Sequence, residues 1–294
     1  MTKVSTRKVI LRVLESWSHT LIALTTMVMV MTIMGALTAR FLGARLLISV
    51  LMGTAGTALL VWALSEVIVN LLGRARVVDV EEFPRFVAVT NDLFSKHWRF
   101  LPRPRLYILK FGGLPNACAY GIGIPGLCAI GITAELYQLL DEEELKAVVA
   151  HELGHLRSFD VGLMTVIVLI TGGAEELSKR FLGGRTALGK GPFALAVGAL
   201  MYLFAKFVIP VGRSAISQER ERAADALGSL FVGTPVPLMT ALGKLEHARI
   251  AHGQGGASET ILTDLFISHP RMATRLNALK TLAAGEDTEE GARQ

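Results

Sequence analysis

The stretch His151-Glu152-Leu153-Gly154-His155 matches H-E-x-x-H, a pattern that provides two zinc-binding histidines and a general base for peptide hydrolysis. On an α-helix the two imidazoles lie about 40° apart around the axis and about 6 Å apart along it, so both can reach one metal ion. The pattern also arises by chance. Its surroundings and a third ligand therefore decide whether it is a metal site.

The residues around the motif predict a capped helix. Asp141 is a candidate N-cap, Glu144 follows three residues later as in a capping box, and the acidic run 141–144 suits the positive end of the helix dipole. Apolar side chains then recur at helical spacing, at Leu145, Val148, Val149, Leu153 and Leu156. The two histidines lie about 120° from the middle of this stripe, which places them in a cleft beside the core.

Composition indicates membrane segments. The 294 residues are 51% hydrophobic, with a mean hydropathy of +0.47. Basic residues of this +5 chain gather near the ends of apolar stretches, which favours a lipid bilayer over nucleic acid as a partner. Cys118 and Cys128 form no C-x-x-C motif. We expect them to be free, buried thiols in a reducing compartment, although they could also meet across a hairpin.

Residues 1–76 are predicted to form an N-terminal transmembrane hairpin with spans at about 16–39 and 46–65. Basic residues flank both outer ends more heavily than the short loop, so the positive-inside rule puts both ends in the cytoplasm. A cleaved signal peptide is the alternative, but the first apolar run is too long and no A-x-A site ends it.

The first part of the catalytic domain is expected at 77–160. It should contain a helix at 81–96 and short strands at 105–109, 117–120 and 127–131, broken by Pro and Gly. If one strand forms the edge of the sheet, its unpaired backbone groups could bind an extended peptide. An ordinary packed strand fits the sequence equally well.

A second apolar or transmembrane hairpin is predicted at 161–212, with re-entrant or surface-lying helices as the alternative. Its two apolar segments are 161–174 and 191–212. The second part of the catalytic domain follows at 213–284, and a polar tail at 285–294. Three helices are expected in that part, at 214–230, 238–251 and 271–283. The resulting fold class is mostly α with a small β-sheet.

A catalytic zinc site needs a third protein ligand. The metzincin pattern is excluded, because position 161 is Val and position 158 is Ser. Glu221 is the leading candidate, since Asp225 lies one helical turn later and could accept a hydrogen bond from a ligating imidazole. Two alternatives stay open here. Residues 219–222 could be a solvated charged face, or Asp160 could be the third ligand.

Several motifs together resemble the HtpX-type membrane zinc metalloproteases, which are related to the prenyl-protein (CAAX) endoproteases. They are Pro115-Asn116-Ala117, His151-Glu-Leu-Gly-His155, Glu221-x-x-x-Asp225, Ser268-His269-Pro270 and Arg275-Leu276. The resemblance covers about 77–282 in motif order and extends to the two-span hairpin before it. Gln218 and Arg271 depart from the family pattern, which affects substrate details only.

The resemblance implies a membrane-anchored metalloprotease domain with a gluzincin site that holds one Zn²⁺ ion per chain. His151, His155 and Glu221 would bind the metal, Glu152 would be the general base, and Asp225 would support the ligands from behind. Asn116 would hold the substrate backbone, and His269 would assist the oxyanion. For these two residues the alternatives are a turn residue and a loop histidine.

The implied function is a membrane-bound zinc endopeptidase in membrane-protein quality control, acting on misfolded or membrane polypeptides. It would lie in a prokaryotic inner membrane with the catalytic domain on the cytoplasmic side; the sequence does not fix its oligomeric state. One alternative is a CAAX-type prenyl-protein endoprotease, which needs more spans. Another is a non-enzymatic protein with structural zinc, whose fourth position would be closed by another ligand. An intramembrane protease is disfavoured by the charges on the H-E-x-x-H helix.

Overall fold

The computed structural model of the chain describes residues 5–18, 62–110, 113–162, 209–251 and 272–284, with isolated positions between 21 and 60. These residues form a mostly helical fold with one small mixed sheet, which confirms the expected fold class. The helices, besides one at 6–18, are α3 (Ser65–Leu72), α4 (Pro84–His97), α5 (Ala134–Leu139), α6 (Glu142–Arg157), α9 (Ile209–Val232), α10 (Val236–Ala251) and α12 (Met272–Ala284).

Four strands make the sheet, in the order β1-β2-β4-β3. They are β1 (Arg76–Val77), β2 (Arg105–Leu109), β3 (Ala117–Gly121) and β4 (Cys128–Thr133). β2 and β4 are parallel, and β3 pairs antiparallel with β4. Within the described part of the chain, β3 therefore lies at an edge of the sheet. The three predicted strands are confirmed, with ends displaced by at most two residues.

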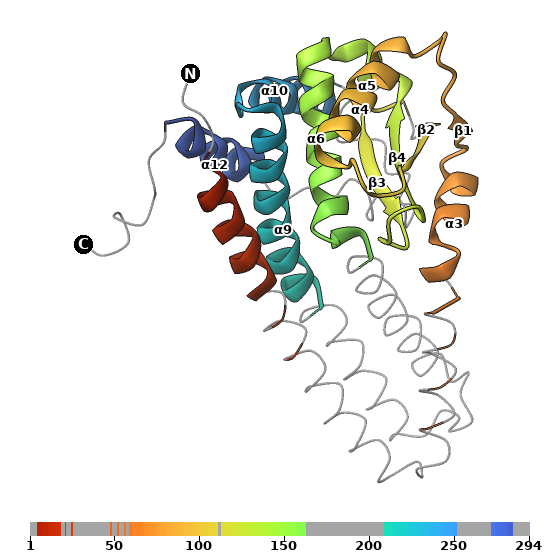
Figure 1. Cartoon of the computed structure of the whole chain (residues 1–294), viewed down its shortest axis with the longest axis horizontal. Helices are drawn as coiled ribbons and strands as arrows, with labels where there is room; N and C mark the ends of the chain where they lie inside the picture. The colour runs from red at the N-terminus through yellow and green to blue at the C-terminus, as the bar shows by residue number, and fades with distance from the viewer. Residues whose placement is uncertain are drawn as a thin grey trace.

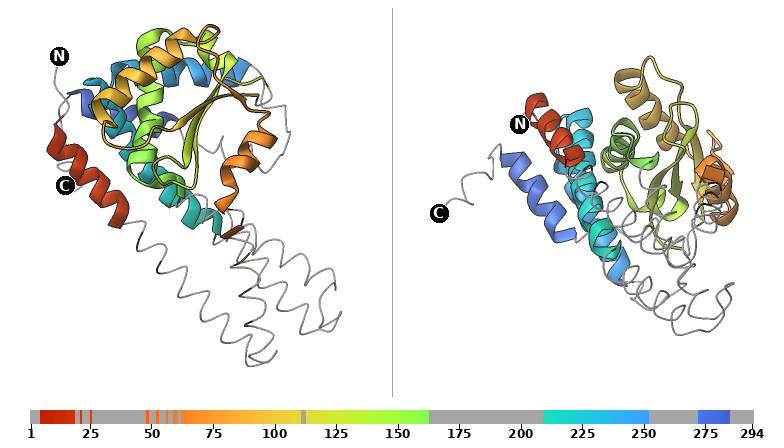
Figure 2. Two further views of the ribbon diagram at one scale, coloured as in Figure 1. Left: turned by 45° about the vertical axis from the view of Figure 1, so that its right-hand side comes forward. Right: turned by 90° about the horizontal axis from the view of Figure 1, so that it is seen from below.

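Both faces of the sheet are covered, by α6 on one side and α3 on the other (Figures 1 and 2). Because side chains alternate along a strand, Ala117 and Ala119 of β3 pack into the larger core under α6. Cys118 of the same strand packs into the smaller core under α3, whereas Cys128 of β4 belongs to the larger core. The two cysteines face opposite sides of the sheet, and both are free and buried as predicted.

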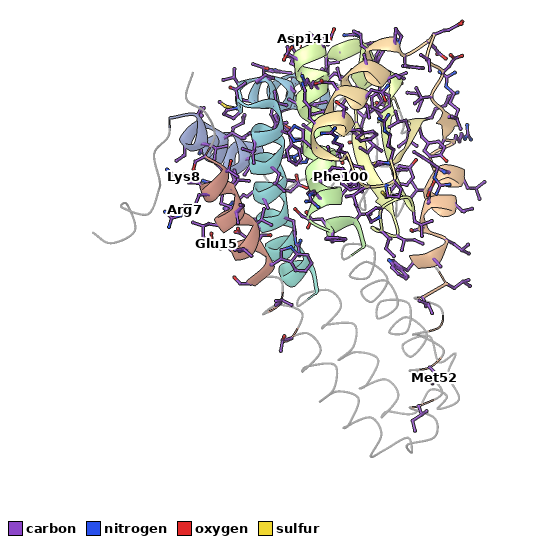
Figure 3. The ribbon with its side chains drawn as sticks, viewed as in Figure 1. Arg7, Lys8, Glu15, Met52, Phe100 and Asp141 are labelled. Atoms are coloured by element: carbon purple, nitrogen blue, oxygen red, sulfur yellow. The ribbon has the colours of Figure 1, made fainter. Side chains whose placement is uncertain are left out.

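A capping box starts α6, as the sequence predicts. The Asp141 carboxylate accepts a hydrogen bond from Glu144 N at 2.9 Å, and the Glu144 carboxylate accepts one from Asp141 N at 3.0 Å. Figure 3 labels Asp141 at this end of the helix. The Glu144 carboxylate also binds Lys244 of α10 at 2.6 Å. These contacts fix the start of the helix that carries H-E-x-x-H.

Two glycines allow α6 and α9 to cross closely. A Cβ on Gly154 of α6 would lie 3.1 Å from the backbone oxygen of Ala224. A Cβ on Gly228 of α9 would lie 2.9 Å from the backbone nitrogen of His151, closer than real Cβ atoms approach. The crossing therefore depends on the absence of side chains at these two positions. It sets the acidic residues of α9 against the histidines of α6.

No helix within the described residues is both long enough and apolar enough to cross a membrane. The predicted apolar segments 16–39, 46–65, 161–174 and 191–212 lie mostly outside the described residues. The domain boundaries at 76, 160, 212 and 284 stay predictions.

Candidate metal centre

Three donor groups converge where α6 meets α9. The Nε2 atoms of His151 and His155 lie 3.1 Å apart, with their rings at 85°. The Glu221 carboxylate reaches both, at 3.5 Å from Nε2 of His151 and 3.3 Å from Nε2 of His155. One donor atom from each residue falls within a group no wider than 4.8 Å. Two imidazoles and a carboxylate match the donor set of a catalytic zinc site, which keeps its fourth position open.

The outer nitrogen of each imidazole is held by an aspartate. His151 Nδ1 lies 2.9 Å from the Asp225 carboxylate, and His155 Nδ1 donates to Asp160 at 3.0 Å. These contacts fix each ring as the tautomer whose Nε2 lone pair faces the other donors. Asp160 therefore lies behind His155, on the side away from the converging atoms. This position does not suit the alternative that makes Asp160 the third ligand.

Each aspartate is in turn held by a buried arginine. Arg275 of α12 donates to both carboxylate oxygens of Asp225, at 2.9 and 2.6 Å, and its third nitrogen lies 3.0 Å from Glu221. Arg220 of α9 forms an ion pair with Asp160. Arg275 is only 3% exposed and Arg220 only 2%. Both imidazoles are thus oriented by a His–Asp–Arg chain.

The charged stretch 219–222 divides into two faces. Glu219 and Arg222 pair with each other at 2.8 Å on the partly exposed side of α9. Arg220 and Glu221 point inward, and Glu221 is only 7% exposed. The solvated-face interpretation is therefore right for the first pair and wrong for the second.

Glu152 supplies a further buried carboxylate. It is 4% exposed and, within the described residues, it forms no hydrogen bond or ion pair. Its charge acts on Cys118 of β3, where burial and then Glu152 raise the pKa of the thiol well above its ordinary value. Glu152 directly follows His151 on α6. It is available as a proton acceptor beside the donor cluster.

The electrostatics of the cluster favour a cation. Burial opposes a charge on His155, but Asp160 and Glu221 outweigh it and raise the pKa of this imidazole well above its ordinary value. Two negative charges remain when the two buried arginines are set against the buried carboxylates of Glu152, Asp160, Glu221 and Asp225. A divalent ion would neutralise them. The donor chemistry and the charge therefore both fit Zn²⁺.

Asn116 precedes the edge strand β3. Its backbone N–H donates to Thr133 Oγ1 at 3.0 Å, and its side-chain oxygen accepts from Ala117 N at 3.0 Å. Its Nδ2 is buried and has no hydrogen-bond partner within the described residues. The N–H donors of this side chain are therefore unused within the described part of the chain. His269, the other residue predicted to contact substrate, lies outside the described residues.

Sequence reasoning gave no role to Arg220 or Arg275 and gave Asp160 a different one. The signal for Arg275 is present in the quoted motif Arg275-Leu276, and Arg220 directly precedes Glu221. No local pattern distinguishes a buried arginine from an exposed one. Their pairing depends on helices that meet only in the folded chain.

Comparison with known proteins places the chain among proteases. The family described as Peptidase family M48 matches residues 82–283. A protein named "Protease HtpX homolog" from Acidiphilium cryptum is 34% identical over 258 residues, covering 84% of this chain and 88% of that protein. A protein of the same name from Aquifex aeolicus is 34% identical over 194 residues, covering 63% of each chain. The predicted resemblance to HtpX is confirmed.

A solved structure has a similar fold. The crystal structure of S. mikatae Ste24p superimposes with a TM-score of 0.53 at 17% identity, covering 90% of this chain and 66% of that one. At this identity the similarity concerns the fold alone. The family match and the HtpX relatives confirm the prediction of a protease. The chain belongs to peptidase family M48, whose members are metalloproteases.

Proposed function

We propose that this metalloprotease is a zinc endopeptidase that holds one Zn²⁺ ion per chain on His151, His155 and Glu221. The observation that carries the proposal is the convergence of the two Nε2 atoms, 3.1 Å apart, on the carboxylate of Glu221. The two uncompensated negative charges around them add support. Zinc is favoured over hard cations because two of the three donors are imidazole nitrogens.

A zinc ion in such a site activates water and polarises the scissile carbonyl. Glu152 would accept a proton on its carboxylate during the attack and return it to the leaving amine. The absence of a hydrogen-bond partner for Glu152 within the described residues supports this role. Asp160 and Asp225 keep the Nδ1 protons on the two imidazoles, so that both Nε2 atoms stay available. His269 is proposed to assist the oxyanion, as the resemblance implies.

The edge of β3 is proposed to bind the polypeptide substrate in an extended form. Asn116 O accepts from Thr133 N, so Asn116 and every second residue after it bond to β4. The backbone N–H and C=O of Ala119 then face away from β4, where a peptide could add as a strand. The Nδ2 of Asn116 would hold the peptide backbone.

If Asn116 binds the substrate backbone, Asn116→Ala is expected to raise KM more than it changes kcat in a series of peptide substrates. An unchanged KM would show that Asn116 does not bind substrate.

We also propose that the chain is a multi-pass protein of the prokaryotic inner membrane with its catalytic domain in the cytoplasm, acting on misfolded or membrane polypeptides. The similarity to HtpX proteases supports a membrane location, and the distribution of basic residues supports this orientation. A reporter fused after Arg76 is expected to behave as cytosolic, and one inserted at 41–44 as exported. The reverse pattern would overturn the orientation.

Metal removal tests the proposed function. The purified full chain is expected to lose peptide hydrolysis when a chelator removes its metal and to regain it with about one equivalent of Zn²⁺. Mg²⁺ should not restore activity, because it prefers oxygen ligands. Casein hydrolysis before chelation, after chelation and after each metal addition gives the result. Undiminished hydrolysis by metal-free protein would contradict the proposal.

A further inference from the structure

Arg220 carries a charge but is among the largest fully buried side chains of the described residues. On one side its guanidinium pairs with Asp160, and the same nitrogen donates to Ser158 O at 3.3 Å. On the other side the indole ring of Trp17 covers it, with the ring centroid 3.9 Å from Arg220 Cζ. Trp17 comes from the helix at 6–18. Arg220 is therefore enclosed between an aspartate of the metal centre and the N-terminal helix.

The helix at 6–18 lies beside α9 and close to α12 (Figures 1 and 2). Val9 and Ser16, which are seven residues apart and so share a helix face, are buried. Arg7 and Glu15 are exposed and extend from the helix away from α9 (Figure 3). One face of this helix is thus built to dock on the catalytic domain, and Trp17 lies next to the buried Ser16.

The indole ring of Trp17 over Arg220 matters because the strength of the Arg220–Asp160 ion pair depends on the exclusion of water. An ion pair strengthens as the local dielectric constant falls, and a cation–π contact is stronger when it is desolvated. Asp160 uses one carboxylate oxygen for Arg220 and the other for His155 Nδ1. A mobile Arg220 would leave Asp160 less firmly placed. The orientation of His155 would then be less favourable for metal binding.

The two histidines differ in what supports them. Behind His151, Arg275 contacts both Asp225 and Glu221 directly. Behind His155, the chain of contacts runs from Asp160 through Arg220 to Trp17. On the His155 side, within the described residues, this chain of side-chain contacts reaches the N-terminal helix, which leads into the first predicted membrane span.

We propose that Arg220 and Trp17 are positioning residues for His155, so that docking of the N-terminal helix strengthens metal binding. The coupling is reciprocal: a bound metal ion must favour docking of the helix by the same factor. This inference rests on the proposed metal centre. It makes the helix at 6–18 a component of the active site, in addition to its predicted role as the start of a membrane anchor.

The test measures zinc affinity of the full chain in detergent or lipid nanodiscs, by competition with a chelator of known affinity. Trp17→Leu is expected to weaken zinc binding about 3- to 30-fold, as loss of a desolvated cation–π contact implies. Trp17→Phe keeps an aromatic face and should recover most of the affinity. Leu14→Ala, on the same helix at a 60% exposed position, is the matched control and should bind zinc as the wild type does.

Hydrogen exchange of residues 6–18 provides a second measurement that a merely structural role would not affect. Zinc should slow exchange in this helix of the wild type, and the zinc effect should disappear in Trp17→Leu. A helix that serves only as an anchor would exchange at the same rate with and without zinc.

The outcomes separate this inference from the proposed function. Wild-type zinc affinity in Trp17→Leu would overturn the inference and leave the zinc peptidase intact. Equal weakening in Trp17→Leu, Trp17→Phe and Leu14→Ala would also overturn it, because the effect would not depend on the aromatic contact. A wild-type chain that binds no zinc would overturn the proposed function and the inference together.

Discussion

Glu152→Gln is expected to lower peptide hydrolysis by about 10²- to 10⁴-fold, the usual contribution of a general base. The amide has nearly the same shape as the carboxylate but cannot accept the proton. Glu152 is not among the converging donors, so the variant should keep about one zinc ion per chain. Casein hydrolysis and zinc content are measured on the same preparation.

Glu143→Gln is the matched control for this variant. Glu143 lies on the same helix α6 but is exposed, and its replacement should leave both hydrolysis and zinc content unchanged. Full activity in Glu152→Gln would contradict the assignment of Glu152 as the general base. Loss of zinc in this variant would instead indicate that Glu152 takes part in metal binding.

Much of the H-E-x-x-H helix can be predicted from the sequence, because its signals are local. Asp141 and Glu144 form the expected capping box, and α6 ends within a few residues of His155. Pro and Gly residues bound the three strands for the same reason. The edge position of β3 was left open by the sequence. It depends on the strand order, which local patterns do not encode.

The support behind the histidines could not be predicted, because it is assembled from distant segments. Asp160 and Arg220 lie 60 residues apart in the chain, and Asp225 and Arg275 lie 50 apart. Charge patterning alone gave equal weight to an exposed and a buried interpretation of 219–222. The deciding fact is the close crossing of α6 and α9 at Gly154 and Gly228, which turns Arg220 and Glu221 inward.

Within the described residues, Asp160 and Glu221 differ in the groups that their carboxylates contact. Asp160 could have been a ligand on spacing alone, but its carboxylate is engaged by His155 Nδ1 and by Arg220. Glu221 contacts Arg275 with one oxygen and still faces both Nε2 atoms. The supporting carboxylates of Asp160 and Asp225 lie on the Nδ1 side of the imidazoles, whereas the proposed ligand Glu221 lies on the Nε2 side.

Glu221→Ala is expected to remove most bound zinc and all measurable hydrolysis. The change deletes one of three donors and one of the negative charges that a divalent ion would neutralise. Asp225→Asn should be milder, with a loss of about 10- to 100-fold in metal affinity, because Asp225 acts on the metal only through His151. Arg275 keeps Asp225 as a partner in Glu221→Ala, so the fold should persist.

Zinc content of the purified full chain, measured by plasma mass spectrometry after identical dialysis, tests the metal centre most directly. Glu219→Ala is the control, because Glu219 lies two residues from Glu221 but faces Arg222 on the partly exposed side of α9. We predict about one zinc ion per chain in the wild type and in Glu219→Ala, and almost none in Glu221→Ala. Full zinc occupancy in Glu221→Ala would contradict the assignment of His151, His155 and Glu221 as the metal ligands.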